Sequence, residues 1–223
     1  MLLPILVIFL FSPAPGIYLL WDWANTMGYL VIATALFLFI YKGRARSFPA
    51  YSGRFFSNLH RDLGYITALL LTGHVGLLLF SEPLLIEHMS PAAPLHMLSG
   101  WIALILMLLL LVTSIPVLRR RIWQDYHFFQ HVHALLAVAV IGLAVYHVVF
   151  SGFYLNENWK TALYSVISTG IVVWSFAFSK PVVSPAITRI RNSSGFSHVI
   201  TYGCTAVALM FCLVIVLLNQ VSA

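Results

Sequence analysis

Apolar residues gather into seven stretches that are separated by shorter polar segments. The stretches lie at about 2–20, 26–41, 60–81, 95–117, 127–150, 160–179 and 197–219. Most are close to the roughly 20 residues that a helix needs to cross the hydrocarbon core of a bilayer. Because lipid offers no hydrogen bonds to the backbone, a helix is the favoured way to cross it. The pattern predicts an all-α integral membrane protein, a bundle of six to seven transmembrane helices.

The first stretch is the least regular, because Pro4, Pro13 and Pro15 interrupt it. Proline removes a backbone donor and breaks or kinks a helix. We therefore expect residues 1–25 to form a short or broken membrane helix. A signal peptide is the alternative, but the stretch has neither a basic start nor a clear small-residue cleavage site.

The composition agrees with a membrane protein. Hydrophobic residues make up 61% of the chain and charged residues 8%, whereas soluble domains carry about 25% charged residues. The two cysteines, Cys204 and Cys212, are eight residues apart in one apolar stretch. On a helix they point about 80° apart, so we expect no disulfide between them.

The charges alternate from loop to loop. Eleven of the twelve basic residues lie before or at the start of the third stretch, or after the fourth and sixth stretches. Lys160 lies on the opposite side, with Glu82, Glu87 and Glu157. Cytoplasmic loops carry the excess of Lys and Arg, which predicts a cytoplasmic N-terminus. The net charge of +6 then reflects the orientation of the chain in the membrane. We expect the protein to contact membrane lipid and not to bind nucleic acid.

Four histidines are spaced in the same way in two of the stretches. His60 and His74 are fourteen residues apart, and so are His133 and His147. Fourteen helical residues make four turns less about 40° and rise about 21 Å. Each helix therefore carries its two histidines on nearly one face, near opposite leaflets. Since both helices run outward from the cytoplasm, His60 should lie level with His133, and His74 with His147.

Two imidazoles from facing helices are the ligands that a low-spin haem needs. The two pairs predict two b-type haems between the third and fifth helices, an inner one at His60/His133 and an outer one at His74/His147. A single membrane histidine more often packs or relays protons, but four at matched depth point to ligation. Small residues in these helices would let a macrocycle or another helix approach; they are Gly64, Gly73, Gly76 and Gly142.

The other histidines fit a ligand role less well. His127 and His131 lie far around the helix from His147 and nearer the cytoplasm, so we expect them at the interface. An outer loop carries four further side chains that could bind a metal ion or could simply be solvated, and both interpretations stay open. They are His88, His96, Glu82 and Glu87. His198 is assigned no role. A zinc site built from the quartet is not expected, because zinc ligands converge on one ion.

Arginines lie near the predicted inner pair. Haem propionates are anionic and accept hydrogen bonds from guanidinium groups. The candidates for this role are Arg54, Arg61 and Arg119, the last in the run Arg119–Arg121. Nearby aromatic residues could pack on a porphyrin edge or simply anchor the chain at the interface; they are Tyr126, Phe128 and Phe129.

Three segments within residues 28–150 resemble the ferric reductase-like transmembrane domain superfamily. LHRDLGY, with a second histidine fourteen residues on, resembles the first ligand helix of that family. SGWIALILMLLLLVTSIPVLRRRIW resembles the following helix, and YHFFQHVHALLAVAVIGLAVYH the second ligand helix. The superfamily includes ferric reductases, NADPH oxidases and the haem subunit of the periplasmic methionine sulfoxide reductase system. Carried over, the haem-iron ligands are His60, His74, His133 and His147.

The resemblance implies a di-haem transmembrane domain over 26–180, followed by a cytoplasmic linker and one more membrane helix over 181–223. It implies a cytochrome b of a bacterial inner membrane that moves electrons to an acceptor on the outer side. Many relatives carry a flavin and nicotinamide domain, which residues 180–223 do not resemble. The donor would be a separate flavoprotein, a quinol or a loosely held flavin, which leaves open whether the chain is an enzyme by itself.

Two other functions stay open. One is a haem-bearing anchor subunit of a larger redox complex, which would copurify with a fixed partner. The other is a haem-free transporter that uses the histidines as proton carriers and would be colourless. All six acids lie in loops or near the ends of the predicted helices, which argues against such a relay.

Overall fold

The computed structural model describes residues 19–42, 51–177 and 194–222, and nearly all of them are helical. The predicted segment 2–20 therefore lies almost wholly outside the described residues. In chain order the elements are α2 (Leu19–Ile40), α3 (Gly53–Ser81), the 3-10 helix η1 (Pro83–Met89), α4 (Leu95–Ser114), α5 (Pro116–Ile122), α6 (Tyr126–Ser151), α7 (Asn158–Ala177) and α8 (Ser194–Ser222).

Several helices begin or end away from the predicted positions. The second begins at Leu19 instead of 26, and the third at Gly53 instead of 60. Ser52 explains why α3 begins early, because its side chain accepts a hydrogen bond from the Phe55 amide and caps the helix. The predicted segment 95–117 is divided at Pro116, which starts α5, since proline disfavours a helical residue before it.

Within the described residues, five helices are long and apolar enough to cross a membrane. They are α2, α3, α4, α6 and residues 196–218 of α8. Large apolar side chains on their outer faces are exposed, among them Leu69, Leu135 and Val207, as expected of surfaces that meet lipid. The chain is thus an all-helical integral membrane protein, as predicted. Among the described helices, α7 does not reach the same hydropathy, although it is 20 residues long.

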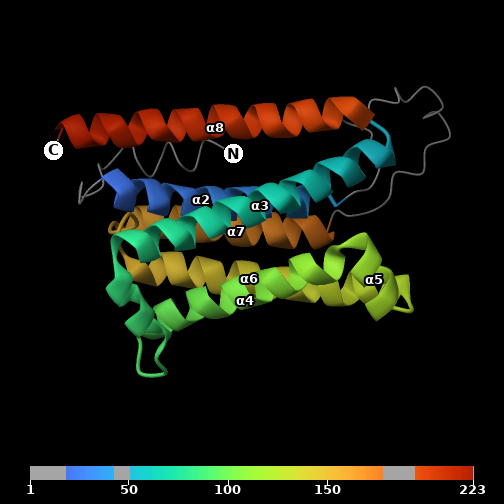
Figure 1. Cartoon of the computed structure of the whole chain (residues 1–223), viewed down its shortest axis with the longest axis horizontal. Helices are drawn as coiled ribbons and strands as arrows, with labels where there is room; N and C mark the ends of the chain where they lie inside the picture. The colour runs from blue at the N-terminus through green and yellow to red at the C-terminus, as the bar shows by residue number, and fades with distance from the viewer. Residues whose placement is uncertain (1–18, 43–50, 178–193, 223) are drawn as a thin grey trace.

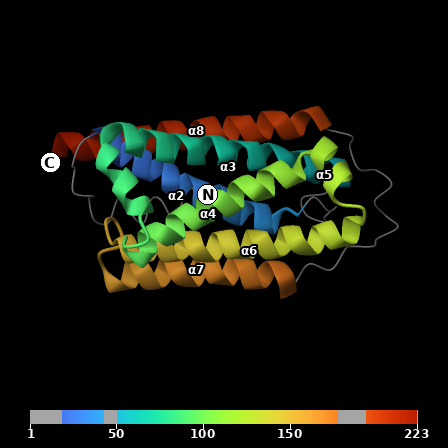
Figure 2. The same ribbon diagram turned by 60° about the horizontal axis from the view of Figure 1, so that its bottom comes forward.

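The bundle consists of two packed helix pairs with further helices around them. In one pair α3 packs on α2, and in the other α4 packs on α6 (Figures 1 and 2). Helix α8 covers α3 and α2, while α7 packs against α2 and α6. The histidine-bearing helices α3 and α6 do not pack on each other, since no Cα of one lies within 8 Å of a Cα of the other. A space between them is therefore left to side chains or a ligand.

Helix α2 forms the centre of the main core. Its side chains Leu30, Ile32 and Leu36 are at most 7% exposed. They belong to one cluster with residues of α3, α7 and α8, including Ile66, Tyr164 and Cys212. Both cysteines are free, as the sequence predicts.

Helix α8 is tied to the bundle at both of its ends through buried acids. Near its start, His198 Nδ1 lies 2.5 Å from Asp62 of α3. Near its end, Gln220 donates to Asp22 of α2 over 2.6 Å. The expectation that every acid lies near a helix end is wrong for Asp62, because α3 begins earlier than predicted and places this acid inside the bundle at 2% exposure.

Candidate functional site

His60 and His133 face each other across the space between α3 and α6. Their ring centroids are 6.2 Å apart and the ring planes are tilted by 52°. Two imidazoles that bind one metal ion through nitrogens at about 2 Å have centroids roughly 6 Å apart. Phe129, one helical turn before His133, packs 5.4 Å from its ring. The structure thus brings together the first predicted pair at one end of the bundle, here named the His60 end.

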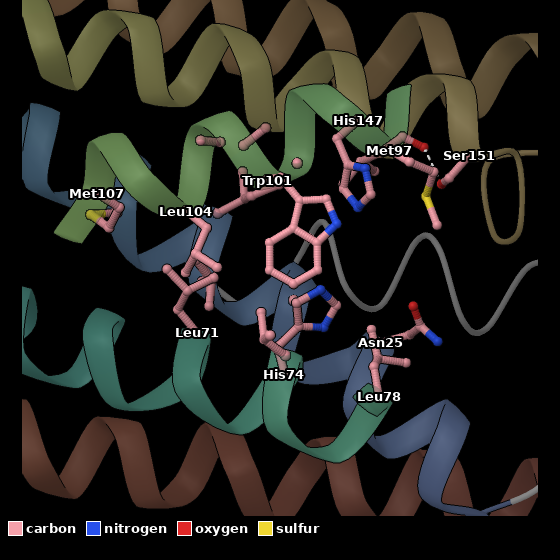
Figure 3. A pocket seen from close by; sticks show the side chains of 18 of the residues that line it. Asn25, Leu71, His74, Leu78, Met97, Trp101, Leu104, Met107, His147 and Ser151 are labelled. Atoms are coloured by element: carbon pink, nitrogen blue, oxygen red, sulfur yellow. Dashed lines mark hydrogen bonds between the residues drawn. The ribbon is translucent and has the colours of Figure 1, made fainter. Parts of the chain in front are cut away.

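His74 and His147 lie at the other end, here named the His74 end. Both line a cavity between α2, α3, α4 and α6 (Figure 3). Counted with the space that opens outward, the cavity has an empty volume of about 1090 Å³. In the view of Figure 3 the indole of Trp101 reaches between the two imidazoles. Both histidines of the second predicted pair therefore border the same cavity.

All four rings are held through the same nitrogen, Nδ1. In three of them Nδ1 lies 2.7–2.8 Å from a backbone carbonyl: His60 from Tyr41, His74 from Ala24 and His147 from His96. A carbonyl only accepts hydrogen bonds, so Nδ1 carries the proton and Nε2 keeps its lone pair. This is the tautomer that a metal ion needs when it binds through Nε2.

His133 is held by a side chain instead. Its Nδ1 lies 3.2 Å from the Ser114 hydroxyl oxygen. The same hydroxyl donates its proton to the Leu110 carbonyl over 2.6 Å. The serine oxygen is therefore left to accept from His133 Nδ1–H, and Nε2 is again the free nitrogen.

Two glycines support the rings at the His74 end. A Cβ on Gly28 of α2 would lie 2.8 Å from the His74 ring, and one on Gly100 of α4 would lie 2.9 Å from the His147 ring. Any larger residue would displace an imidazole from its carbonyl partner. Sequence reasoning missed this role, and the signal was only a lone glycine in each neighbouring helix. Of the glycines that it did select, Gly73 touches Met27, while nothing lies within 4 Å of a Cβ on Gly64, Gly76 or Gly142.

The three candidate arginines lie in different surroundings. Arg119 is partly buried and sits over the rings of Tyr126 and Phe129 at 5.4 and 5.6 Å, so Phe129 connects it to His133. Arg61 is largely exposed, with Nε 3.5 Å from Asp62. Arg54 is exposed in the first turn of α3.

The remaining histidines stay outside the two pairs. His127 and His131 are exposed, as expected, and His131 Nδ1 lies 2.8 Å from the His127 carbonyl. His96 takes part through its backbone, as the acceptor for His147. Within residues 19–42, 51–177 and 194–222, no three or more metal-ligating side chains converge, and the set around His88 forms no such group.

Comparison with known proteins identifies the family. The model of the ferric reductase like transmembrane component matches residues 27–144, a range that includes three of the four histidines and ends just before His147. No curated protein and no solved structure matches the chain. Because the match spans more than half of the chain, the protein belongs to the ferric reductase-like transmembrane family and is a transmembrane redox component.

Proposed function

We propose that the chain is a di-haem cytochrome b that carries electrons across the membrane. The observation that supports this best is that all four histidines, two on α3 and two on α6, are held through the same ring nitrogen. The two helices that carry them do not pack on each other. Each ring is fixed at Nδ1, which leaves Nε2 free to bind a metal ion. Such second-sphere hydrogen bonds orient ligand imidazoles and raise their basicity.

The residues present fit two haems. His60 and His133 would hold one, and His74 and His147 the other, with the two sites about 21 Å apart along the helices. The cavity at the His74 end is lined largely by apolar side chains, including Leu71, Leu104 and Val148, which suits a buried macrocycle. When bound, each haem iron would accept and release one electron at a time.

The chain's own groups would set the properties of the two sites. Gly28 and Gly100 keep the rings of His74 and His147 against the neighbouring helices. Arg119 supplies a positive charge near His133 that suits an anionic propionate, and Arg61 and Arg54 are further candidates. The apolar faces of α2 and α4 would keep water from the iron.

We place the donor at the His60 end and the acceptor at the His74 end. The basic residues gather toward the His60 end in sequence, which makes that end cytoplasmic. A separate flavoprotein or a quinol would deliver electrons there. The outer-side acceptor would be a redox partner or ferric iron, in keeping with the family.

Electron transfer across vesicles tests this proposal. The haem-loaded chain would be placed in vesicles that enclose ferricyanide, and dithionite would be added outside. We expect the enclosed ferricyanide to be reduced, because the two sites together span the membrane. The reduction should stop in His60→Ala and in His74→Ala. A native chain that reduces no more than protein-free vesicles, or variants that keep the native rate, would refute the proposal.

A further inference from the structure

Three buried polar side chains lie along one face of α7. Lys160, Tyr164 and Ser168 follow each other at intervals of four residues, the spacing of one helix face. They are 2%, 8% and 2% exposed. Lys160 is the third residue of α7, and α7 packs against α2 and α6. The face is therefore turned into the bundle.

The polar atoms of this face lack hydrogen-bond partners. Within the described part of the chain, none is found for Lys160 Nζ, Tyr164 Oη or Ser168 Oγ. Lys160 Nζ forms an ion pair with the Glu157 carboxylate at 3.7 Å, which is beyond hydrogen-bond distance. Burial of such groups without partners destabilises the fold. Since buried polar groups in proteins are nearly always satisfied, something other than the described chain must satisfy these.

The chemistry of the three side chains suits water. They lie one helical turn apart on the same face of α7. Lysine offers only donors, while the two hydroxyls both donate and accept. A water molecule between each pair of neighbours would satisfy all three side chains. Buried waters of this kind typically make two to four hydrogen bonds.

The same face borders titratable groups near the His74 end. The Tyr29 ring lies 6.2 Å from Tyr164 and 5.8 Å from Tyr154, and Tyr29 also lines the cavity of His74 and His147. Tyr154 donates its hydroxyl proton to Asp22 over 2.8 Å. Burial, together with the Asp22 carboxyl, raises the pKa of Tyr154, so this phenol stays protonated.

We propose that a file of internal water molecules occupies the inner face of α7 and gives protons access from the His74 end to the interior of the bundle. Its mouth lies at Lys160, beside Glu157, which is 39% exposed, and it ends at Ser168. The adjacent Tyr29 connects it to the wall of the histidine cavity. This inference does not need haem, and it stands apart from the proposed electron transfer.

Hydroxyl-radical labelling tests the file in the full chain in its membrane. Short X-ray pulses after rapid mixing with ¹⁸O-water oxidise side chains that touch water, and mass spectrometry locates the label. We expect ¹⁸O label on Tyr164 although it is buried, because the file exchanges with bulk water. Phe56, which is 1% exposed in a separate apolar cluster, is the control and should stay unlabelled.

Two serine variants give a matched comparison. In Ser168→Ala we expect the labelling of Tyr164 to fall by roughly half or more, because the water loses a polar partner. In Ser175→Ala it should not change, since that hydroxyl already donates to the Val172 carbonyl over 2.7 Å. Lys160→Met should close the mouth and abolish the label. Native Tyr164 labelled no more than Phe56, or equal labelling in the two serine variants, would overturn the inference.

Discussion

The two histidine pairs have the same spacing in sequence, but different parts of the protein hold them. At the His74 end both rings bond backbone carbonyls and rest against glycines. At the His60 end His133 depends on the Ser114 hydroxyl and is packed by Phe129, with Arg119 behind it. The backbone thus holds both histidines of the His74 pair. In the other pair His133 is held by side chains, which a single substitution can change. We therefore expect the His74 pair to tolerate little change in neighbouring helices, and the His60 pair to be more easily adjusted.

Glycine substitutions should give the largest difference between the ends. In Gly28→Ala or Gly100→Ala the new methyl group would lie under 3 Å from a pinned imidazole. We expect the haem affinity of the His74 pair to fall by about 10- to 100-fold, as when an outer-sphere partner is lost. The His60 pair should keep its haem. Haem titration of the purified variants measures this.

Gly170→Ala and Gly203→Ala are the controls, because a Cβ at either position meets nothing within 4 Å. Both should bind haem like the native chain. Equal affinity in the Gly28 and Gly203 variants would show that the glycines do not support the rings.

Removal of the serine hydroxyl should have a smaller effect, at the opposite end. Ser114→Ala leaves His133 Nδ1 without its partner at 3.2 Å. We expect weaker haem binding at the His60 pair and no change at the His74 pair, because the ring loses orientation but keeps its position. Thr113→Ala is the matched control, since that hydroxyl donates to the Leu109 and Leu110 carbonyls of its own helix. An equal effect of both variants would contradict the role of Ser114.

Arg119 should give the smallest effect, on potential instead of binding. Arg119→Gln removes a positive charge that favours the reduced, less positive haem at the His60 pair. We expect that midpoint potential to fall by on the order of tens of millivolts, since the site is near the surface and well screened. A spectroscopic redox titration would show it.

Arg120→Gln makes the same charge change at an exposed position and should shift the potential less. If the His74 haem moved as much as the His60 haem in Arg119→Gln, the assignment of this arginine to one site would fail.

The pairing of the histidines could be predicted from sequence because it depends only on helical geometry and on the direction of the two helices. The supporting contacts could not. The carbonyl that His74 bonds belongs to Ala24, fifty residues earlier, and any residue type could provide it. Gly28 and Gly100 gain their role only from the way α2 and α4 pack. Lys160 stands at the first position of a predicted apolar stretch, directly after polar residues, and only the packing of α7 shows that it is buried.

The haem content of the purified full chain tests the central claim most directly. A pyridine haemochrome assay against protein concentration should give two b-type haems per chain. It should give about one in His60→Ala and one in His74→Ala, with the reduced-minus-oxidised spectrum losing a different component in each. A native chain that binds no haem when haem is in ample supply, or alanine variants that keep both haems, would contradict the account.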